Sequence, residues 1–208
     1  SFKSHCGGLV APESDNNPWH YKISWNPRNI VMAGQAGAAY KEKNEIIRKE
    51  YTHVFEDCEH LQVDDLPTLA WYPNRDSLSY IPLYQLQEAE TFIRTTLRYA
   101  DFCKGWDVVV DLGLTNENDA AEIVHYKTFH DWFAGKLRNV EGRDLSLRMY
   151  LELYVAEAVH ELILEQFAFL ETESNEALPA HVKSSADILQ YIVERKLALQ
   201  STDKDMIV

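Results

Sequence analysis

Several features are scarce or missing in this 208-residue chain, and each narrows what the chain can be. No run of about 18 apolar residues occurs, so we expect no membrane-spanning helix and no membrane partner. No positively charged leader precedes an apolar stretch, so we expect no signal peptide. Only three cysteines are present, Cys6, Cys58 and Cys103. Their odd number and irregular spacing predict free thiols in a reducing compartment, the cytoplasm, and not a disulfide framework.

Basic residues are in the minority. The chain has 20 Lys and Arg against 33 Asp and Glu, a net charge of -13. Nucleic acid needs a basic surface to bind, so we expect no nucleic-acid partner. An anionic small molecule is still compatible with this composition, because a few arginines in a concave site create a local positive field on an acidic protein.

Glycine-rich phosphate loops are also missing. Gly34 and Gly37 lie near a strand-like segment, but a dinucleotide fingerprint needs three glycines in the pattern G-x-G-x-x-G. We therefore interpret the two as loop or helix-packing glycines. No Walker-type loop and no Gly-x-Ser-x-Gly nucleophile elbow occurs either. We do not expect this chain to hold the phosphates of a cofactor in a standard glycine-rich loop.

The composition of the chain is typical of a globular protein. Its 46% apolar and 12% aromatic content is enough to bury a core. Residues 1–75 are punctuated by Gly, Pro and Asn, which mark turns between short apolar runs. These runs predict extended segments over Phe2–Cys6, Tyr21–Trp25, Asn29–Ala33 and Leu69–Tyr72.

From residue 76 onward the apolar residues recur every three or four positions, which is typical of helices. This spacing predicts helices over Glu88–Phe102, Trp106–Leu112, Glu117–Trp132, Asp144–Leu170 and Ser184–Leu199. The last of these has Ser184 or Ser185 as its N-cap. The chain is therefore expected to be α+β, with a strand-bearing portion followed by a helical portion.

Two Glu-x-x-His sequences, at residues 122–125 and 157–160, are candidate metal ligands. Two such motifs on facing helices, with a glutamate from each of two further helices, form a di-iron carboxylate site. Glu88 or Glu90 and Glu194 are candidates for the further glutamates, but they fit only loosely. We favour solvated helix faces and expect no metal.

Three arginines are candidate anion-binding groups. Arg94 and Arg98 are four residues apart on a predicted helix and so share a face, where acidic side chains or an anionic ligand must neutralise them. Arg75 lies in a turn and can grip a carboxylate with two hydrogen bonds. Ion pairing with acidic neighbours is the alternative for all three. Cys6, at a strand end before two glycines, is interpreted as a buried or pocket-lining thiol.

Several segments resemble the signatures of glutamate-forming saccharopine dehydrogenases. Residues 6–13 read Cys-Gly-Gly-Leu-Val-Ala-Pro-Glu, where the family has Cys-Gly-Gly-Leu-x-Ala-Pro-Glu. Residues 21–28 read Tyr-Lys-Ile-Ser-Trp-Asn-Pro-Arg and resemble the family's Tyr-Lys-Phe-Ser-Trp-x-x-Arg. Residues 72–77 and 96–99 match two further signatures, and residues 203–208 resemble the segment before the family's return to its nucleotide domain. The resemblance runs in order from one end of the chain to the other.

The resemblance implies an internal piece of such an enzyme, in which the dinucleotide-binding Rossmann domain is absent. The implied fold is a mixed β-sheet with helices on one side plus an all-helical subdomain. Residues 1–75 would be the strand-rich part of a substrate-binding and dimerisation domain. Residues 76–208 would be the mainly helical subdomain, with the last residues returning toward the sheet.

The activity that the resemblance implies is the NADP-linked oxidation of saccharopine to glutamate and aminoadipate semialdehyde, or the reverse, in a homodimer. Matched position by position, the implied substrate contacts are Cys6, Asn74, Arg75, Thr96, Leu97 and Arg98. Arg28 is implied to approach NADP, which the missing domain would mainly bind. The general acid or base stays unassigned, and this piece alone is expected to be inactive.

The sequence departs from the family pattern in places. His5 stands where Phe or Tyr is usual, Thr95 where Gly is common, and Trp19-His20 where a Leu-Gly-like pair is found. These departures keep alternatives open. A carboxynorspermidine dehydrogenase-like enzyme is one, although retention of both Arg75 and Arg98 favours saccharopine. A helical di-metal protein and a non-catalytic dimerisation module are the others.

Overall fold

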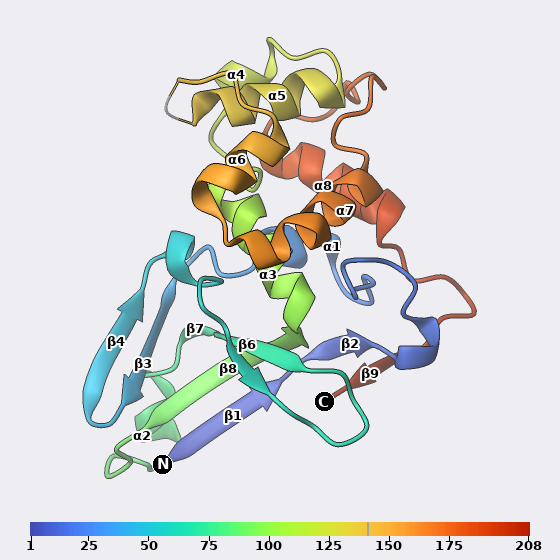
Figure 1. The fold of residues 1–208 in the computed structure, drawn as a ribbon. Helices are drawn as coiled ribbons and strands as arrows, with labels where there is room; N and C mark the ends of the chain where they lie inside the picture. The colour runs from blue at the N-terminus through green and yellow to red at the C-terminus, as the bar shows by residue number, and fades with distance from the viewer. Residues whose placement is uncertain (141) are drawn as a thin grey trace.

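A seven-stranded mixed sheet forms the base of the molecule in the computed structural model, which describes residues 1–140 and 142–208 (Figure 1). Its strands are β1 (Phe2–Cys6), β3 (Ala38–Glu42), β4 (Glu45–Lys49), β5 (Glu59–Leu61), β6 (Leu69–Pro73), β7 (Arg75–Asp76) and β8 (Phe92–Tyr99). The strand order is β4-β3-β8-β6-β5, and β1 and β7 run parallel to β8 and β3. A separate two-stranded sheet pairs β2 (Gly8–Val10) with β9 (Asp205–Ile207).

Most of the helices lie over one face of the sheet (Figure 1). The helices of the described residues are α1 (Pro27–Val31), α2 (Tyr80–Leu83), α3 (Ala100–Asp111), α4 (Ala120–Ile123), α5 (Phe129–Asn139), α6 (Leu147–Tyr154), α7 (His160–Leu170) and α8 (Ser185–Lys196). The short 3-10 turns are η1 (Pro12–Ser14), η2 (Tyr51–His53) and η3 (Glu157–Val159). The short α2 lies apart from the others, beside the sheet near the N-terminus. This architecture confirms the predicted α+β fold with a mixed sheet and a helical subdomain.

Two hydrophobic cores flank the sheet. The larger one fills the space between the sheet and the helices and includes Trp19, Trp106 and Phe167. The smaller one covers the opposite face around Trp71 and Leu97. The strand β8 carries buried residues on both faces, as the adjacent pairs Phe92-Ile93 and Arg98-Tyr99 show.

The strand β8 overturns the helix predicted over Glu88–Phe102. Its sequence, Phe-Ile-Arg-Thr-Thr-Leu-Arg-Tyr, is rich in β-branched and aromatic residues, which favour strands. Because apolar residues lie on both faces of this strand, their spacing in the sequence resembles that of a helix. Helix α3 begins only at Ala100. The sheet therefore takes strands from both sides of residue 75.

The extended conformation predicted for Asn29–Ala33 is also wrong, because α1 covers most of it. The Asn26 side chain caps this helix by accepting a hydrogen bond from the backbone N–H of Arg28, and Pro27 occupies its first turn. The segment Tyr21–Trp25 makes only an isolated bridge between Ile23 and Ala198.

Two long predicted helices are divided in the structure. Residues 117–132 hold the short α4 and only the start of α5. Residues 144–170 are split into α6, η3 and α7, because Val155 and Ala156 are extended. The strands predicted over Phe2–Cys6 and Leu69–Tyr72 are confirmed, as is Ser184 as the N-cap of α8.

The three cysteines are free, as predicted. None of the helices in the described residues combines the length and the apolar character that crossing a membrane requires.

Candidate functional site

A cavity of about 620 Å³ brings together most of the residues that the sequence singled out. Its walls come from the β1–β2 junction, the segment around α1, the β6–β7 junction, the middle of β8, and β9. Cys6, Asn74, Arg75, Thr96 and Arg98 all line it. The cavity thus unites residues from the first strand of the chain, such as Cys6, with residues of the last strand, such as Asp205.

The register of the strands explains why these residues lie close together. Cys6 on β1 and Tyr72 on β6 both pair with Thr96 of β8, one from each side. Side chains alternate between the two faces of a strand, so Thr96 and Arg98 share the face that carries the cavity. Arg94 and Arg98 also share a face, although the reason is strand and not helix periodicity.

Leu97 contributes to the site through its backbone. Its side chain points to the opposite face, into the smaller core, and is 1% exposed. Its carbonyl oxygen accepts a hydrogen bond of 2.8 Å from Nη1 of Arg98. A Cβ atom on Gly7 would lie 2.3 Å from the same carbonyl oxygen, so only glycine lets the chain after Cys6 pass this close to β8.

Arg98 is a buried cation without an acidic partner. Arg98 is only 8% exposed. Its Nη1 donates hydrogen bonds to the carbonyl oxygens of Leu97, at 2.8 Å, and of Gly8, at 3.5 Å. Its Nε is buried with no hydrogen-bond partner, and none of the described carboxylates forms an ion pair with it. The rings of Tyr21 and Phe102 lie 5.1 and 5.7 Å from its guanidinium carbon. A buried charge is costly unless it is paired, so this guanidinium favours an anionic ligand in the cavity.

Arg75 is the second cation of the cavity, and it is exposed. Its backbone has a left-handed φ of 50°, a conformation uncommon for residues other than glycine. The turn is anchored on one side by the backbone N–H of Asn74, which donates to Arg94, and on the other by pairing of Arg75 with Ala38. Arg75 also borders a neighbouring hollow of about 780 Å³ next to β3 and β4.

Two tyrosines complete the floor of the cavity. Burial raises the pKa of Tyr21 and of Tyr72, and the nearby Arg98 charge opposes the rise in both cases. Both phenols therefore stay neutral near pH 7 and can donate hydrogen bonds to an anion. Neither was among the site residues expected from the sequence, although both lie within the segments that matched the family.

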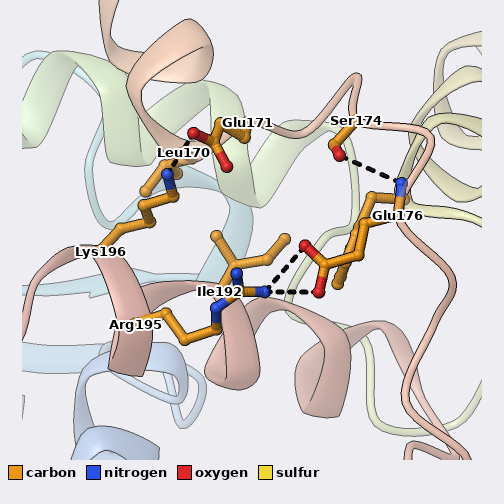
Figure 2. Close-up of a pocket in the computed structure, with 8 residues that line it drawn as sticks. Leu170, Glu171, Ser174, Glu176, Ile192, Arg195 and Lys196 are labelled. Carbon is orange, nitrogen blue, oxygen red and sulfur yellow. Dashed lines mark hydrogen bonds and ion pairs between the residues drawn. The ribbon is translucent and has the colours of Figure 1, made fainter.

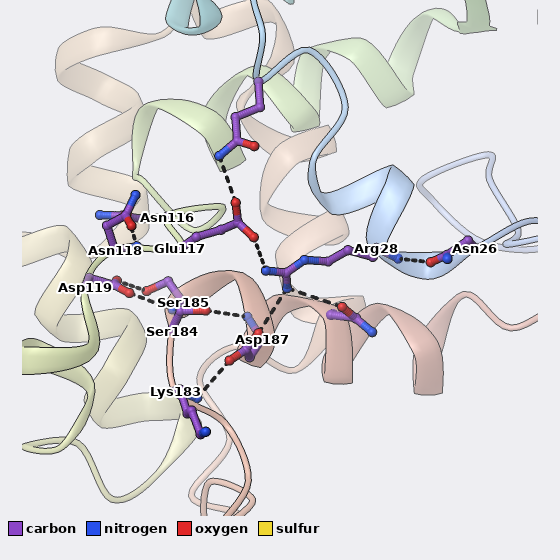
Figure 3. A network of polar contacts seen from close by, with 12 residues as sticks. Asn26, Arg28, Asn116, Glu117, Asn118, Asp119, Lys183, Ser184, Ser185 and Asp187 are labelled. Carbon is purple, nitrogen blue, oxygen red and sulfur yellow. Dashed lines mark hydrogen bonds and ion pairs between the residues drawn. The ribbon is translucent and has the colours of Figure 1, made fainter.

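Arg28 lies outside the cavity lining, in a network between α1 and α8 (Figure 3). Its Nη1 donates to Oδ1 of Asp187 at 3.0 Å, and its Nη2 forms an ion pair with Glu117. Gln190 accepts a further hydrogen bond of 3.3 Å. Two carboxylates already neutralise this guanidinium, so the structure does not bring Arg28 together with the other expected site residues.

Another, much smaller hollow lies between α8 and the end of α7 (Figure 2). Arg195 and Lys196 line it, but each faces a glutamate. Nη1 of Arg195 is 2.9 Å from Glu176, and Lys196 forms an ion pair of 2.5 Å with Glu171. The charges of both cations are thus balanced within the chain, in contrast to Arg98.

The two Glu-x-x-His motifs do not converge on a metal site. Glu122 accepts from Lys136 and Asn139, and Nε2 of His160 donates to the carbonyl oxygen of Val155. Within residues 1–140 and 142–208, no group of three or more His, Cys, Asp or Glu side chains is arranged to hold a metal ion.

By comparison with known proteins, this chain is an α+β domain of the type found in dehydrogenases. The chain belongs to the saccharopine dehydrogenase family, because the family model described as "Saccharopine dehydrogenase C-terminal domain" matches residues 1–208. The family expected from the sequence is thereby confirmed.

The chain is similar to proteins from plants and fungi. It is 31% identical over 223 residues to alpha-aminoadipic semialdehyde synthase of Arabidopsis thaliana, covering 100% of this chain and 21% of that protein. It is 39% identical over 117 residues to saccharopine dehydrogenase (NADP(+), L-glutamate-forming) of Schizosaccharomyces pombe, covering 56% and 26%. A solved structure of apo histidine-tagged saccharopine dehydrogenase (L-Glu forming) from Saccharomyces cerevisiae matches with a TM-score of 0.81 at 28% identity, covering 100% of this chain and 47% of that one. The chain spans about half the length of these relatives, or less.

Proposed function

We propose that this chain is the substrate-binding part of an NADP-dependent, glutamate-forming saccharopine dehydrogenase. The reaction is the oxidation of saccharopine to glutamate and aminoadipate semialdehyde, or its reverse. The observation that carries the proposal is Arg98, a buried guanidinium without an acidic partner that shares one cavity with Arg75. The names of the fungal relatives support the same substrate and cofactor.

The chemistry of saccharopine fits this cavity. The molecule carries three carboxylates joined by flexible arms to a secondary amine. A guanidinium offers a planar fork that binds a carboxylate with two parallel hydrogen bonds, which an ammonium group cannot do. Arg98 binds one carboxylate at the cavity floor, where the surrounding apolar groups strengthen the attraction. Arg75, at the cavity edge, binds a second one.

The neutral side chains then orient the ligand. Tyr21 and Tyr72 donate hydrogen bonds from the floor. Asn74 adds a polar contact from the β6–β7 junction, and Thr96 adds one from β8. Cys6 lies next to Thr96 and lines the end at which the secondary amine reacts. Fixing both carboxylates aligns the amine carbon for reaction, so that orientation is the main contribution of this chain.

NADP is proposed to bind mainly outside this chain, where it supplies the hydride acceptor. The described residues do not form a phosphate cradle: Gly34 and Gly37 have left-handed φ values in a loop, and Arg28 is already paired. We accordingly propose that the isolated chain is inactive. From the family resemblance and the free cysteines, we also propose that the full-length protein is a cytoplasmic homodimer. Tight NADP binding by residues 1–208 alone would contradict the proposal that NADP binds mainly outside this chain.

The test is saccharopine-dependent reduction of NADP by the full-length protein. Arg75→Ala removes one charge-assisted contact worth roughly 1.5–3 kcal/mol, so we expect the KM for saccharopine to rise about 10- to 100-fold while the Kd for NADP stays unchanged. Arg98→Ala should act in the same direction, and its folding is checked by thermal melting.

Arg94→Ala is the matched control. Arg94 lies on the same strand as Arg98, but its guanidinium stacks 3.8 Å from the centre of the Tyr80 ring, outside the cavity lining. Unchanged saccharopine kinetics in both Arg75→Ala and Arg98→Ala would overturn the proposal. Faster oxidation of carboxynorspermidine than of saccharopine by the unmodified protein would assign a different substrate.

A further inference from the structure

Asp205 is the only carboxylate among the described residues that line the cavity. The other ionisable groups there are the two guanidiniums, the Cys6 thiol and two phenols held neutral by burial. A ligand composed only of carboxylates would gain nothing from an acidic neighbour. The presence of one negative group in the same cavity as two positive ones therefore points to a ligand that carries both signs.

The strand β9 holds Asp205 firmly in place. It pairs antiparallel with β2, so that Val10 lies opposite Asp205 and Leu9 opposite Met206. Met206 packs against the smaller core, and side-chain alternation along the strand turns Asp205 to the other side, where it lines the cavity.

Contacts at both ends of β9 fix its position. Before the strand, Nζ of Lys22 lies 2.7 Å from Oδ2 of Asp203, in an ion pair whose side chains are only 6% and 10% exposed. After the strand, the backbone groups of Val208 and Gly7 exchange two hydrogen bonds of 2.9 and 3.0 Å. The Asp205 backbone is thus set beside the Cys6-Gly7 wall of the cavity.

The carboxylate of Asp205 is itself free. It is exposed, and none of the described residues donates a hydrogen bond to it or forms an ion pair with it. Its neighbour Lys204 is instead directed to Glu13, at 3.1 Å. An unpaired carboxylate in a cavity with an unpaired buried guanidinium is complementary to an α-amino acid head group, which presents a carboxylate and an ammonium group on one carbon.

We propose that Asp205 binds the primary α-ammonium group of saccharopine, on the arm derived from lysine. This inference rests on the proposed function. The secondary amine is the less suitable partner, because it must lose its proton before the adjacent C–H bond is oxidised, and a fixed carboxylate beside it would retain that proton. The primary ammonium stays charged throughout the reaction. Asp205 is therefore a specificity-determining residue that selects an intact amino acid head group.

The experiment compares two substrates in the full-length protein. One is saccharopine, and the other is its deamino analogue, in which hydrogen replaces the primary amino group. In the unmodified protein we expect the KM for the analogue to exceed that for saccharopine about 10- to 100-fold, the range of one charge-assisted hydrogen bond. In Asp205→Asn this ratio should fall to near one, and in Asp205→Glu it should be partly restored.

Asp64→Asn is the matched control, because Asp64 is an exposed acid in a turn outside the cavity lining and its replacement changes the net charge by the same amount. A ratio in Asp205→Asn equal to that of the unmodified protein would overturn the inference and leave the proposed function intact. If the unmodified protein does not oxidise saccharopine at all, the proposed function fails, and the inference fails with it.

Discussion

Trp25 differs from the other four tryptophans of the chain. It is 73% exposed and lines the cavity, whereas Trp19, Trp106 and Trp132 are fully buried and Trp71 is 8% exposed. A large exposed aromatic side chain at the mouth of a site is a surface that a ligand can cover. The fluorescence of Trp25 therefore reports on the cavity.

We predict that saturating saccharopine lowers the quenching of tryptophan fluorescence by acrylamide in the full-length protein. A polar quencher in water reaches Trp25 more readily than the four buried rings, and a bound ligand shields that ring. The Stern–Volmer constant measures the effect. In Trp25→Phe, the ligand-dependent change should disappear. An unchanged constant in the unmodified protein at saturating saccharopine would show that the ligand binds elsewhere.

His5 and Thr95 depart from the family pattern, and they are partners in the structure. They occupy paired positions on β1 and β8, and Nδ1 of His5 lies 2.7 Å from Oγ1 of Thr95. Burial lowers the pKa of His5, which keeps its ring neutral near pH 7. The two substitutions therefore form one hydrogen bond on the sheet face opposite the cavity.

At the scale of elements, one buried carboxylate connects the segment before α4 to α5 and α8. Asp119 Oδ2 lies 2.6 Å from Nζ of Lys136, and their side chains are 1% and 6% exposed. Ser185 donates two hydrogen bonds to Asp119 (Figure 3). Its hydroxyl also accepts one of 2.8 Å from Nε1 of Trp132. Because these groups are buried, each depends on its partners to offset its desolvation.

Lys136→Met is expected to lower the free energy of unfolding by about 3–5 kcal/mol, because it leaves the buried Asp119 charge without its partner. Urea denaturation measures the change. Arg138→Met is the control on the same helix, since Arg138 and Asp144 form an exposed pair with 62% and 84% side-chain exposure, which contributes about 0–1 kcal/mol. Equal effects of the two substitutions would contradict the assigned role of Asp119.

At the scale of the whole molecule, α3 leads from the end of β8 into the helical layer (Figure 1). Its Asp107 is partly buried, and burial, followed by the charges of Asp111, Glu56 and Asp57, raises its pKa to about 7. The folded state therefore holds a proton at Asp107 that the unfolded chain has already released. The stability of the fold is coupled to pH at this position.

Since the pKa of Asp107 is higher in the folded than in the unfolded state, stability should be lost as pH rises from about 4 to about 7. Asp107→Asn removes this ionisation. We expect its free energy of unfolding to depend less on pH in that range and to exceed that of the unmodified protein at about pH 8. Chemical denaturation across the range measures both effects. A loss of stability with rising pH that is the same in both proteins would show that other groups cause it.

The sequence by itself determined the family, the α+β fold and those elements whose signals are local. Ser184 caps α8 wherever the helix packs, and β1 and β6 end at turn residues close by in the chain. Motif segments such as Cys6-Gly7-Gly8 could be recognised without knowing their neighbours. All these signals are contained in a few consecutive residues.

Only the tertiary structure decided which of these residues meet. Pairing with β1, β3 and β6 made β8 a strand despite its helix-like spacing. The same pairing placed Cys6 and Tyr72 beside Thr96. The same pairing turned the Leu97 side chain away from the cavity. Arg28 forms ion pairs with Glu117 and Asp187 outside the cavity lining. Strand pairing and charge compensation join residues far apart in the chain, and no local pattern encodes such partners.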